Sequence, residues 1–152
     1  MRKVHGIISL TMLMVPFIVG LYAVITASLN AGILYAVLLL LLPMIIIYSF
    51  CAKCSCKSEG CGHVLPGKIA GFMPDRRGQK YTGRDMAGVI IPFLILVVFP
   101  QPWLYANIVL PVIFWIVLAV SLAYIRLYVC IGCENTECPF CKDIHEGGAI
   151  AR

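Results

Sequence analysis

Eight cysteines, arranged in two groups, are the residues of this 152-residue chain whose types and spacing are best suited to chemistry. The first cysteine cluster has the spacing Cys-x2-Cys-x-Cys-x4-Cys, and the second has the spacing Cys-x2-Cys-x4-Cys-x2-Cys. The first cluster consists of Cys51, Cys54, Cys56 and Cys61, and the second of Cys130, Cys133, Cys138 and Cys141. A Cys-x2-Cys turn can hold both sulfurs about 2.3 Å from one Zn²⁺, and two such turns complete a tetrahedron. The spacing therefore predicts metal binding, with all eight cysteines as candidate ligands.

Two assignments of ligands to metal are compatible with these clusters. Each cluster can close its own site of four thiolates, or each can contribute a pair of cysteines to a shared site. The second cluster has only four residues between its two turns, which is tight for one ion and is an argument for sharing. His63 follows Cys61 by two residues and is a possible further ligand, although a histidine here is also typical of a solvated loop. The sequence leaves both assignments open.

The spacing favours zinc over an iron–sulfur cluster. Bacterial ferredoxin-type sites use Cys-x2-Cys-x2-Cys-x3-Cys followed by proline, and neither cysteine cluster has that spacing. Zn²⁺ needs only the paired turns. Zinc is therefore the expected cofactor, and an iron–sulfur cluster is the alternative.

Each cysteine cluster begins where a long apolar run ends, so the elements that position the thiols are expected to be membrane helices. The chain is 61% hydrophobic and 12% charged, whereas soluble domains carry about 25% charged residues. A membrane-spanning helix needs about 20 apolar residues. The apolar runs predict four such helices, over residues 6–28, 32–50, 86–100 and 107–129. The expected fold is an all-α integral membrane protein, in which the first helix is retained because it is longer than the apolar part of a signal peptide.

The predicted transmembrane helices are expected to pair as two antiparallel hairpins, because the connection within each pair is short and uncharged. The hairpins occupy residues 1–50 and 86–129. A Cys-rich basic loop over 51–85 and a Cys-rich tail over 130–152 are expected to form a small cytoplasmic metal-binding module. The third helix, 86–100, is short for a full crossing and is expected to lean on a partner subunit. Since the helices are expected to hold no buried acid or base, the sequence argues against transport.

Lysine and arginine residues gather in three places and predict the orientation of the chain. They precede the first helix, fill the middle loop, or end and follow the fourth helix: Arg2, Lys3, Lys53, Lys57, Lys68, Arg76, Arg77, Lys80, Arg84, Arg126, Lys142 and Arg152. Because positive charge beside membrane helices stays cytoplasmic, we expect a multi-pass protein of the cell membrane with both termini in the cytoplasm. Both cysteine clusters then lie in a reducing compartment, where metal binding is more common than structural disulfides.

The middle loop mixes basic and apolar residues with glycine and proline. It is expected to lie along the lipid headgroups with Phe72 dipping toward the apolar layer, and the alternative is an ordinary cytoplasmic loop. The residues expected to meet lipid headgroups are Lys68, Arg76, Arg77 and Lys80. Lys53 and Lys57 lie within the first cysteine cluster and are expected to offset the negative charge of thiolate–metal centres. Thr82 and Asp85 have the spacing of a capping box for the third helix.

The function that this pattern favours is that of a small structural or interaction subunit of a membrane complex. The chain has paired cysteines at two helix ends, but it has no histidine pair or nucleophile motif typical of an enzyme. We therefore expect zinc sites that stabilise a cytoplasmic module. Its partners are expected to be the lipid bilayer and a protein on the cytoplasmic face or within the membrane, and no nucleic acid is expected.

A membrane redox protein is the alternative, using an iron–sulfur centre or thiol–disulfide exchange with a quinone. The segment Cys138-Pro139-Phe140-Cys141 is similar to the dithiol of glutaredoxin-type proteins, but this chain cannot build their βαβ scaffold. Four membrane helices with a Cys-x2-Cys pair also resemble, in outline, the quinone-linked disulfide-forming enzymes of the bacterial membrane. Those enzymes present their cysteines to the oxidising side, whereas the charge pattern here predicts the opposite side.

Overall fold

A computed structural model describes residues 2–54, 56, 61–130, 135 and 138–139 of the chain. These described residues form helices and no strand, which confirms the predicted all-α class. The helices are α1 (Arg2–Ala27), α2 (Leu29–Ser49), the 3-10 helix η1 (Cys51–Lys53), α3 (Val64–Gly71), α4 (Gly83–Val98), α5 (Gln101–Leu104), α6 (Val109–Tyr124) and the π-helix η2 (Ile125–Cys130). Of the predicted metal ligands, Cys133 and Cys141 lie outside the described residues.

Four helical segments are long and apolar enough to cross a membrane, as the sequence predicts. They are Lys3–Ala27, Leu29–Lys53, Gly83–Leu104 and Val109–Cys130. Only 17% to 33% of the most apolar stretch of each segment is buried inside the protein. Helices that are apolar on their exposed faces as well as their packed faces are typical of membrane spans.

The third of these segments is longer than predicted from the sequence. It runs over 22 residues from Gly83 to Leu104, so the expectation that it falls short of a full crossing is wrong. It starts early because the predicted capping box is confirmed: the Asp85 carboxylate accepts the backbone N–H of Thr82 at 2.8 Å. It ends late because the short helix α5 extends the segment beyond Pro100.

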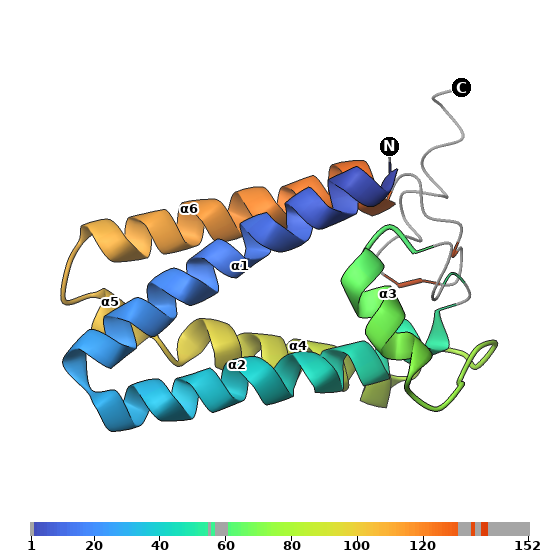
Figure 1. The fold of residues 1–152 in the computed structure, drawn as a ribbon, viewed down its shortest axis with the longest axis horizontal. Helices are drawn as coiled ribbons and strands as arrows, with labels where there is room; N and C mark the ends of the chain where they lie inside the picture. The colour runs from blue at the N-terminus through green and yellow to red at the C-terminus, as the bar shows by residue number, and fades with distance from the viewer. Residues whose placement is uncertain (1, 55, 57–60, 131–134, 136–137, 140–152) are drawn as a thin grey trace.

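The four long helices lie in two side-by-side pairs (Figure 1). α1 packs chiefly against α6, α2 packs chiefly against α4, and contacts between α1 and α2 join the two pairs. The predicted grouping into two hairpins is therefore not confirmed, because α4 and α6 each pack more on the first two helices than on each other. The start of α1, the helix α3 and the end of α6 lie together, and α5 lies at the opposite end of the bundle (Figure 1). We call the former the cysteine end, because the described members of both cysteine clusters lie there.

The buried apolar core lies in the half of the bundle that contains α5. Its members come from all four long helices and from α5 itself: Phe17, Ala23, Val24, Tyr35, Leu96, Val97, Leu104, Phe114 and Leu118. The Tyr35 hydroxyl donates a hydrogen bond to the Leu96 carbonyl at 2.8 Å. That carbonyl lies four residues before Pro100, which has no N–H to donate. In a membrane an unpaired carbonyl is costly, so Tyr35 supplies the donor that the proline lacks.

The middle loop contains one short helix, α3, which lies across the cysteine end (Figure 1). Pro66 lies in its first turn, where a missing N–H costs nothing. Phe72 follows α3 directly, and its side chain is 94% exposed. The loop thus presents an aromatic side chain outward beside the ends of the membrane helices.

Candidate functional site

A cavity of about 500 Å³ lies at the cysteine end, between the end of α2, the start of α4 and the end of α6. Apolar side chains from these three helices form much of its wall, among them Phe50, Val89 and Leu122. Five of the six cysteines that the structure describes line the cavity, and they belong to both clusters: Cys51, Cys54, Cys61, Cys130 and Cys138. We call this space the thiol cavity. It brings together predicted ligands that lie far apart in the sequence.

Two helix ends deliver thiols to the thiol cavity. Cys51 begins η1 directly after α2, and the backbone N–H of Cys54 closes this turn on the Cys51 carbonyl at 3.2 Å. Cys130 is the last residue of the π-helix η2. π-Helical turns are rare and are frequent at functional sites. The second cluster therefore begins on a helical turn of unusual geometry that faces the end of α2 across the cavity.

The start of α1 holds the surroundings of the thiol cavity in place. His5 Nδ1 lies 2.7 Å from the Tyr124 hydroxyl, and the His5 ring stacks on Tyr128 with the ring centroids 5.4 Å apart. Gly6 lies so close to Gly62 that a Cβ atom would overlap the Gly62 carbonyl. Only glycine permits this approach of helix and loop. α1 thus holds two neighbours of the cavity in place, namely the end of α6 and the loop at Gly62, between Cys61 and His63.

His63 is partly buried and is not the solvated loop residue that the sequence allows. Its ring lines the thiol cavity, and its Nδ1 atom is buried with no hydrogen-bond partner among the described residues. Burial lowers the pKa of His63, and a hydrogen bond with the backbone of Gly6 offsets only part of this effect. The imidazole is therefore neutral at neutral pH, which is the form that binds metals.

Asn135 ties the segment of the second cluster to the first cluster. Its side-chain nitrogen donates to Cys54 Sγ at 3.4 Å and to the Tyr81 hydroxyl at 3.1 Å. Cys138, three residues further on, lies within electrostatic reach of the Cys51 thiol. Burial raises the pKa of Tyr81, so its hydroxyl stays protonated and available for hydrogen bonding. The two clusters are therefore connected by direct contacts as well as by the shared cavity.

The donor set around the thiol cavity suits a borderline-soft metal ion. Thiolates and a neutral imidazole are the usual protein ligands of zinc. Within the part of the chain that the structure describes, no three His, Cys, Asp or Glu side chains lie close enough together to hold a metal ion. In a zinc site each Zn–S distance is about 2.3 Å, so the described thiols would have to converge for one ion to bind them together. Cys56 is buried but is not among the residues that line the cavity.

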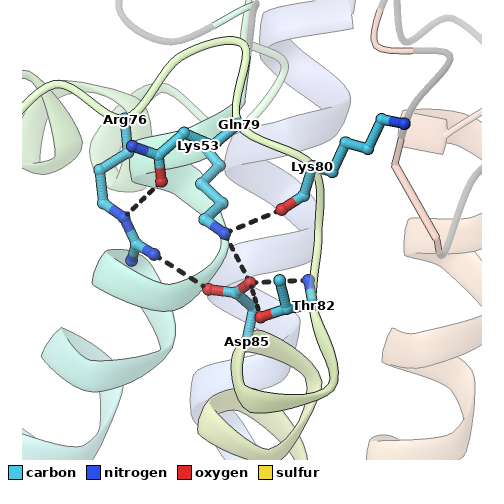
Figure 2. A network of polar contacts seen from close by, with 6 residues as sticks. All are labelled: Lys53, Arg76, Gln79, Lys80, Thr82 and Asp85. Carbon is cyan, nitrogen blue, oxygen red and sulfur yellow. Dashed lines mark hydrogen bonds and ion pairs between the residues drawn. The ribbon is translucent and has the colours of Figure 1, made fainter.

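A buried ion pair joins the turn after α2 to the first turn of α4 (Figure 2). Lys53 Nζ donates to Asp85 Oδ2 at 2.6 Å, and the two side chains are 3% and 5% exposed. The same carboxylate accepts the Thr82 hydroxyl at 2.6 Å and the Arg76 guanidinium at 3.3 Å. Lys53 Nζ also donates to the Lys80 carbonyl at 3.0 Å. Asp85 lies in the first turn of α4, one residue before the predicted helix 86–100, so it is outside the stretch for which the sequence predicts no acid or base.

The four basic residues predicted to meet lipid headgroups have different surroundings. Arg76 belongs to the buried network just described. Arg77 forms an exposed ion pair with Asp75 at 2.9 Å. Lys68, on α3, and Lys80 are exposed. Contact between these side chains and lipid stays a prediction.

The contact partners of several residues at the cysteine end are not predicted by the sequence. Lys53 was expected beside thiolates, but its ammonium group pairs with Asp85. The capping-box pattern identified Asp85 as a helix cap and gave no sign of a partner from a distant helix. Asn135 and Tyr81 carry no motif, and their roles depend on contacts between segments that are far apart in the chain.

Comparison of the chain with protein-family models, with curated proteins and with solved structures found no match. The class of protein is therefore defined by the fold. Four apolar helices of sufficient length indicate a multi-pass membrane protein. Its particular function has to be inferred from the thiol cavity.

Proposed function

We propose that this chain is a small multi-pass membrane protein whose cysteine end binds a metal ion, zinc, and serves as a structural or interaction module of a membrane complex. The observation that carries the proposal is the thiol cavity. Five thiols and one partly buried imidazole line a single space beyond the apolar helices. This donor set matches structural zinc sites, which hold protein segments together through four protein ligands.

The same features support a structural role rather than catalysis. Zinc has no redox chemistry of its own, and a catalytic zinc site keeps an open position beside a general acid or base. Asp85, the buried carboxylate where α2 and α4 meet, already has Lys53, Arg76 and Thr82 as partners. The exposed Phe72 beside the cysteine end offers a contact for a protein partner or for lipid.

We further propose that the cysteine end faces the cytoplasm at the cell membrane. The basic residues of the middle loop support this orientation. An epitope tag inserted at Gly78, which has a positive φ of 78° and open surroundings, tests it. In sealed, inside-out membrane vesicles an antibody should reach this tag and should fail to reach a tag inserted at Ala106, near α5. The reverse pattern would overturn the proposed orientation.

An iron–sulfur cluster is the second candidate occupant, and the size of the cavity is the observation that favours it. A space of about 500 Å³ exceeds what one ion and its ligand bonds require. A cluster in this position would make the protein a carrier of electrons rather than a structural subunit. Brown colour and visible absorption of anaerobically purified protein would support this candidate over zinc.

Metal analysis of the purified full chain tests the proposed function. The protein is extracted in mild detergent without chelators and under anaerobic conditions, and its zinc and iron contents are measured by mass spectrometry. We expect zinc in stoichiometric amount, with thiols that react with an alkylating reagent only after a chelator is added. Absence of zinc and iron, together with rapid alkylation of all eight thiols in the native protein, would overturn the proposal.

A further inference from the structure

We propose that one metal ion is held jointly by thiolates of both cysteine clusters across the thiol cavity, fastening the end of α2 to the end of α6. The proposal rests on the proposed function and adds what the spacing leaves open, namely which cysteines share the metal. It makes the ion a clamp between the two helix pairs of the bundle.

The lining of the cavity is the first observation in favour of a shared site. Cys51 and Cys54 enter it from the turn that follows α2. Cys130 enters it from the last turn of η2, which continues α6. These helices belong to different pairs, since α2 packs on α4 and α6 packs on α1. A metal bound between their ends therefore connects two helices that belong to different pairs.

Direct contacts between the clusters are the second, independent observation. Asn135, from the segment of the second cluster, donates to Cys54 Sγ of the first. The Cys51 thiol interacts electrostatically with Cys61 and Cys54 of its own cluster and, more weakly, with Cys138 of the second. The hydrogen bond from Asn135 therefore holds the segment of the second cluster against the first, where a shared ion would bind.

The geometry also predicts what binding changes. Because a zinc thiolate bond is about 2.3 Å long and no three ligands converge among the described residues, the sulfurs must come closer together when the ion binds. Each thiol that becomes a ligand releases its proton to the solvent. The bound ion therefore links distant parts of the chain. Because it binds the folded state in preference to the unfolded state, it stabilises the fold by mass action.

The experiment counts metal ions in the full chain and in matched pairs of variants. Metal-free protein in detergent is titrated anaerobically with Co²⁺, whose visible absorption reports thiolate coordination, and then with Zn²⁺. One variant carries Cys51→Ser and Cys54→Ser, and another carries Cys130→Ser and Cys138→Ser. The control is Cys56→Ser, because Cys56 belongs to the first cluster but does not line the cavity.

A shared site predicts one tightly bound ion per chain, complete loss of that ion in either double variant, and full retention in Cys56→Ser. Two ions in the unmodified chain, with one remaining in each double variant, would overturn the shared site and leave the proposed function standing. No ion in the unmodified chain would overturn the proposed function itself.

Thiol footprinting tests the shared site in the unmodified chain, so its result does not depend on whether the variants fold. Protein loaded with Zn²⁺ is treated with an alkylating reagent while a chelator is added stepwise, and each cysteine is followed by peptide mass spectrometry. The shared site predicts that Cys51, Cys54, Cys130 and Cys138 become reactive together. Release of the two clusters at different chelator concentrations would contradict it.

Discussion

Asp85 shows how one buried carboxylate joins several parts of this molecule. It caps α4 through Thr82, pairs with Lys53 from the turn after α2, and accepts a hydrogen bond from Arg76 of the middle loop. The ion pair lies at the end of the bundle where α2 and α4 meet. A buried pair of this kind is costly to break, because removing one partner leaves the other charge buried without compensation.

Replacement of Asp85 by asparagine is therefore expected to destabilise the protein strongly. The change leaves Lys53 buried without its partner and removes charge from the helix cap, at a cost of about 3–5 kcal/mol. The loss is measured as a lower temperature of aggregation in detergent solution. Asp75→Asn is the matched control, because its ion pair with Arg77 is half exposed and should contribute little. Equal effects of the two substitutions would contradict the role given to Asp85.

Single residues also show which contacts can be predicted from the sequence and which cannot. The Thr82–Asp85 spacing predicted the helix cap correctly, because a capping box is local and spans four residues. The partner Lys53 could not be predicted, since it lies on another helix and nothing local specifies the contact. The same limit applies to Asn135, whose contact with Cys54 joins the two cysteine clusters.

At the scale of elements, the break between α4 and α5 depends on contacts from a neighbouring helix. Pro100 ends α4 and removes the donor for the Leu96 carbonyl, and Tyr35 of α2 replaces that donor. The Gln101 side chain satisfies the Val97 carbonyl at 2.7 Å in a similar way. The apolar runs predicted two helices here, over residues 86–100 and 107–129, but the extension through α5 depends on these tertiary contacts.

Tyr35→Phe is expected to destabilise the bundle by about 1 kcal/mol, the usual value of one such hydrogen bond. The reason is that the Leu96 carbonyl loses its donor in an apolar environment. Stability is measured by reversible denaturation in mixed detergent micelles. Tyr22→Phe is the control, since the Tyr22 side chain is largely exposed on α1. A loss of stability in both variants, or in neither, would argue against the assigned role of the Tyr35 hydroxyl.

The contact between α1 and the loop after the first cluster gives a second prediction at this scale. Gly6→Ala should weaken metal binding by about 10- to 100-fold, the usual effect of disturbing groups that orient metal ligands. The added Cβ meets the Gly62 carbonyl, so the loop and His63 must move. Affinity is measured by competition with a chromophoric zinc chelator. Gly83→Ala is the control because its Cβ meets no atom within 4 Å, and equal affinities of the two variants would refute the prediction.

At the scale of the whole molecule, the bundle is packed tightly near α5 and opens into the thiol cavity at the cysteine end. Composition and apolar runs predicted four membrane helices because those signals extend over about 20 residues each. The pairing of α1 with α6 and of α2 with α4 could not be predicted, since apolar helices carry little information about their neighbours. That pairing brings the ends of α2 and α6 to opposite sides of one cavity.

Cross-linking of thiols in native membranes shows whether both cysteine clusters form one site. After metal removal, a short bifunctional thiol reagent is added to the unmodified protein, and linked peptides are identified by mass spectrometry. We predict abundant links between the first and second clusters, in particular between Cys51 or Cys54 and Cys138. Links confined to cysteines of the same cluster, in a sample where the reagent has reacted fully, would contradict the claim.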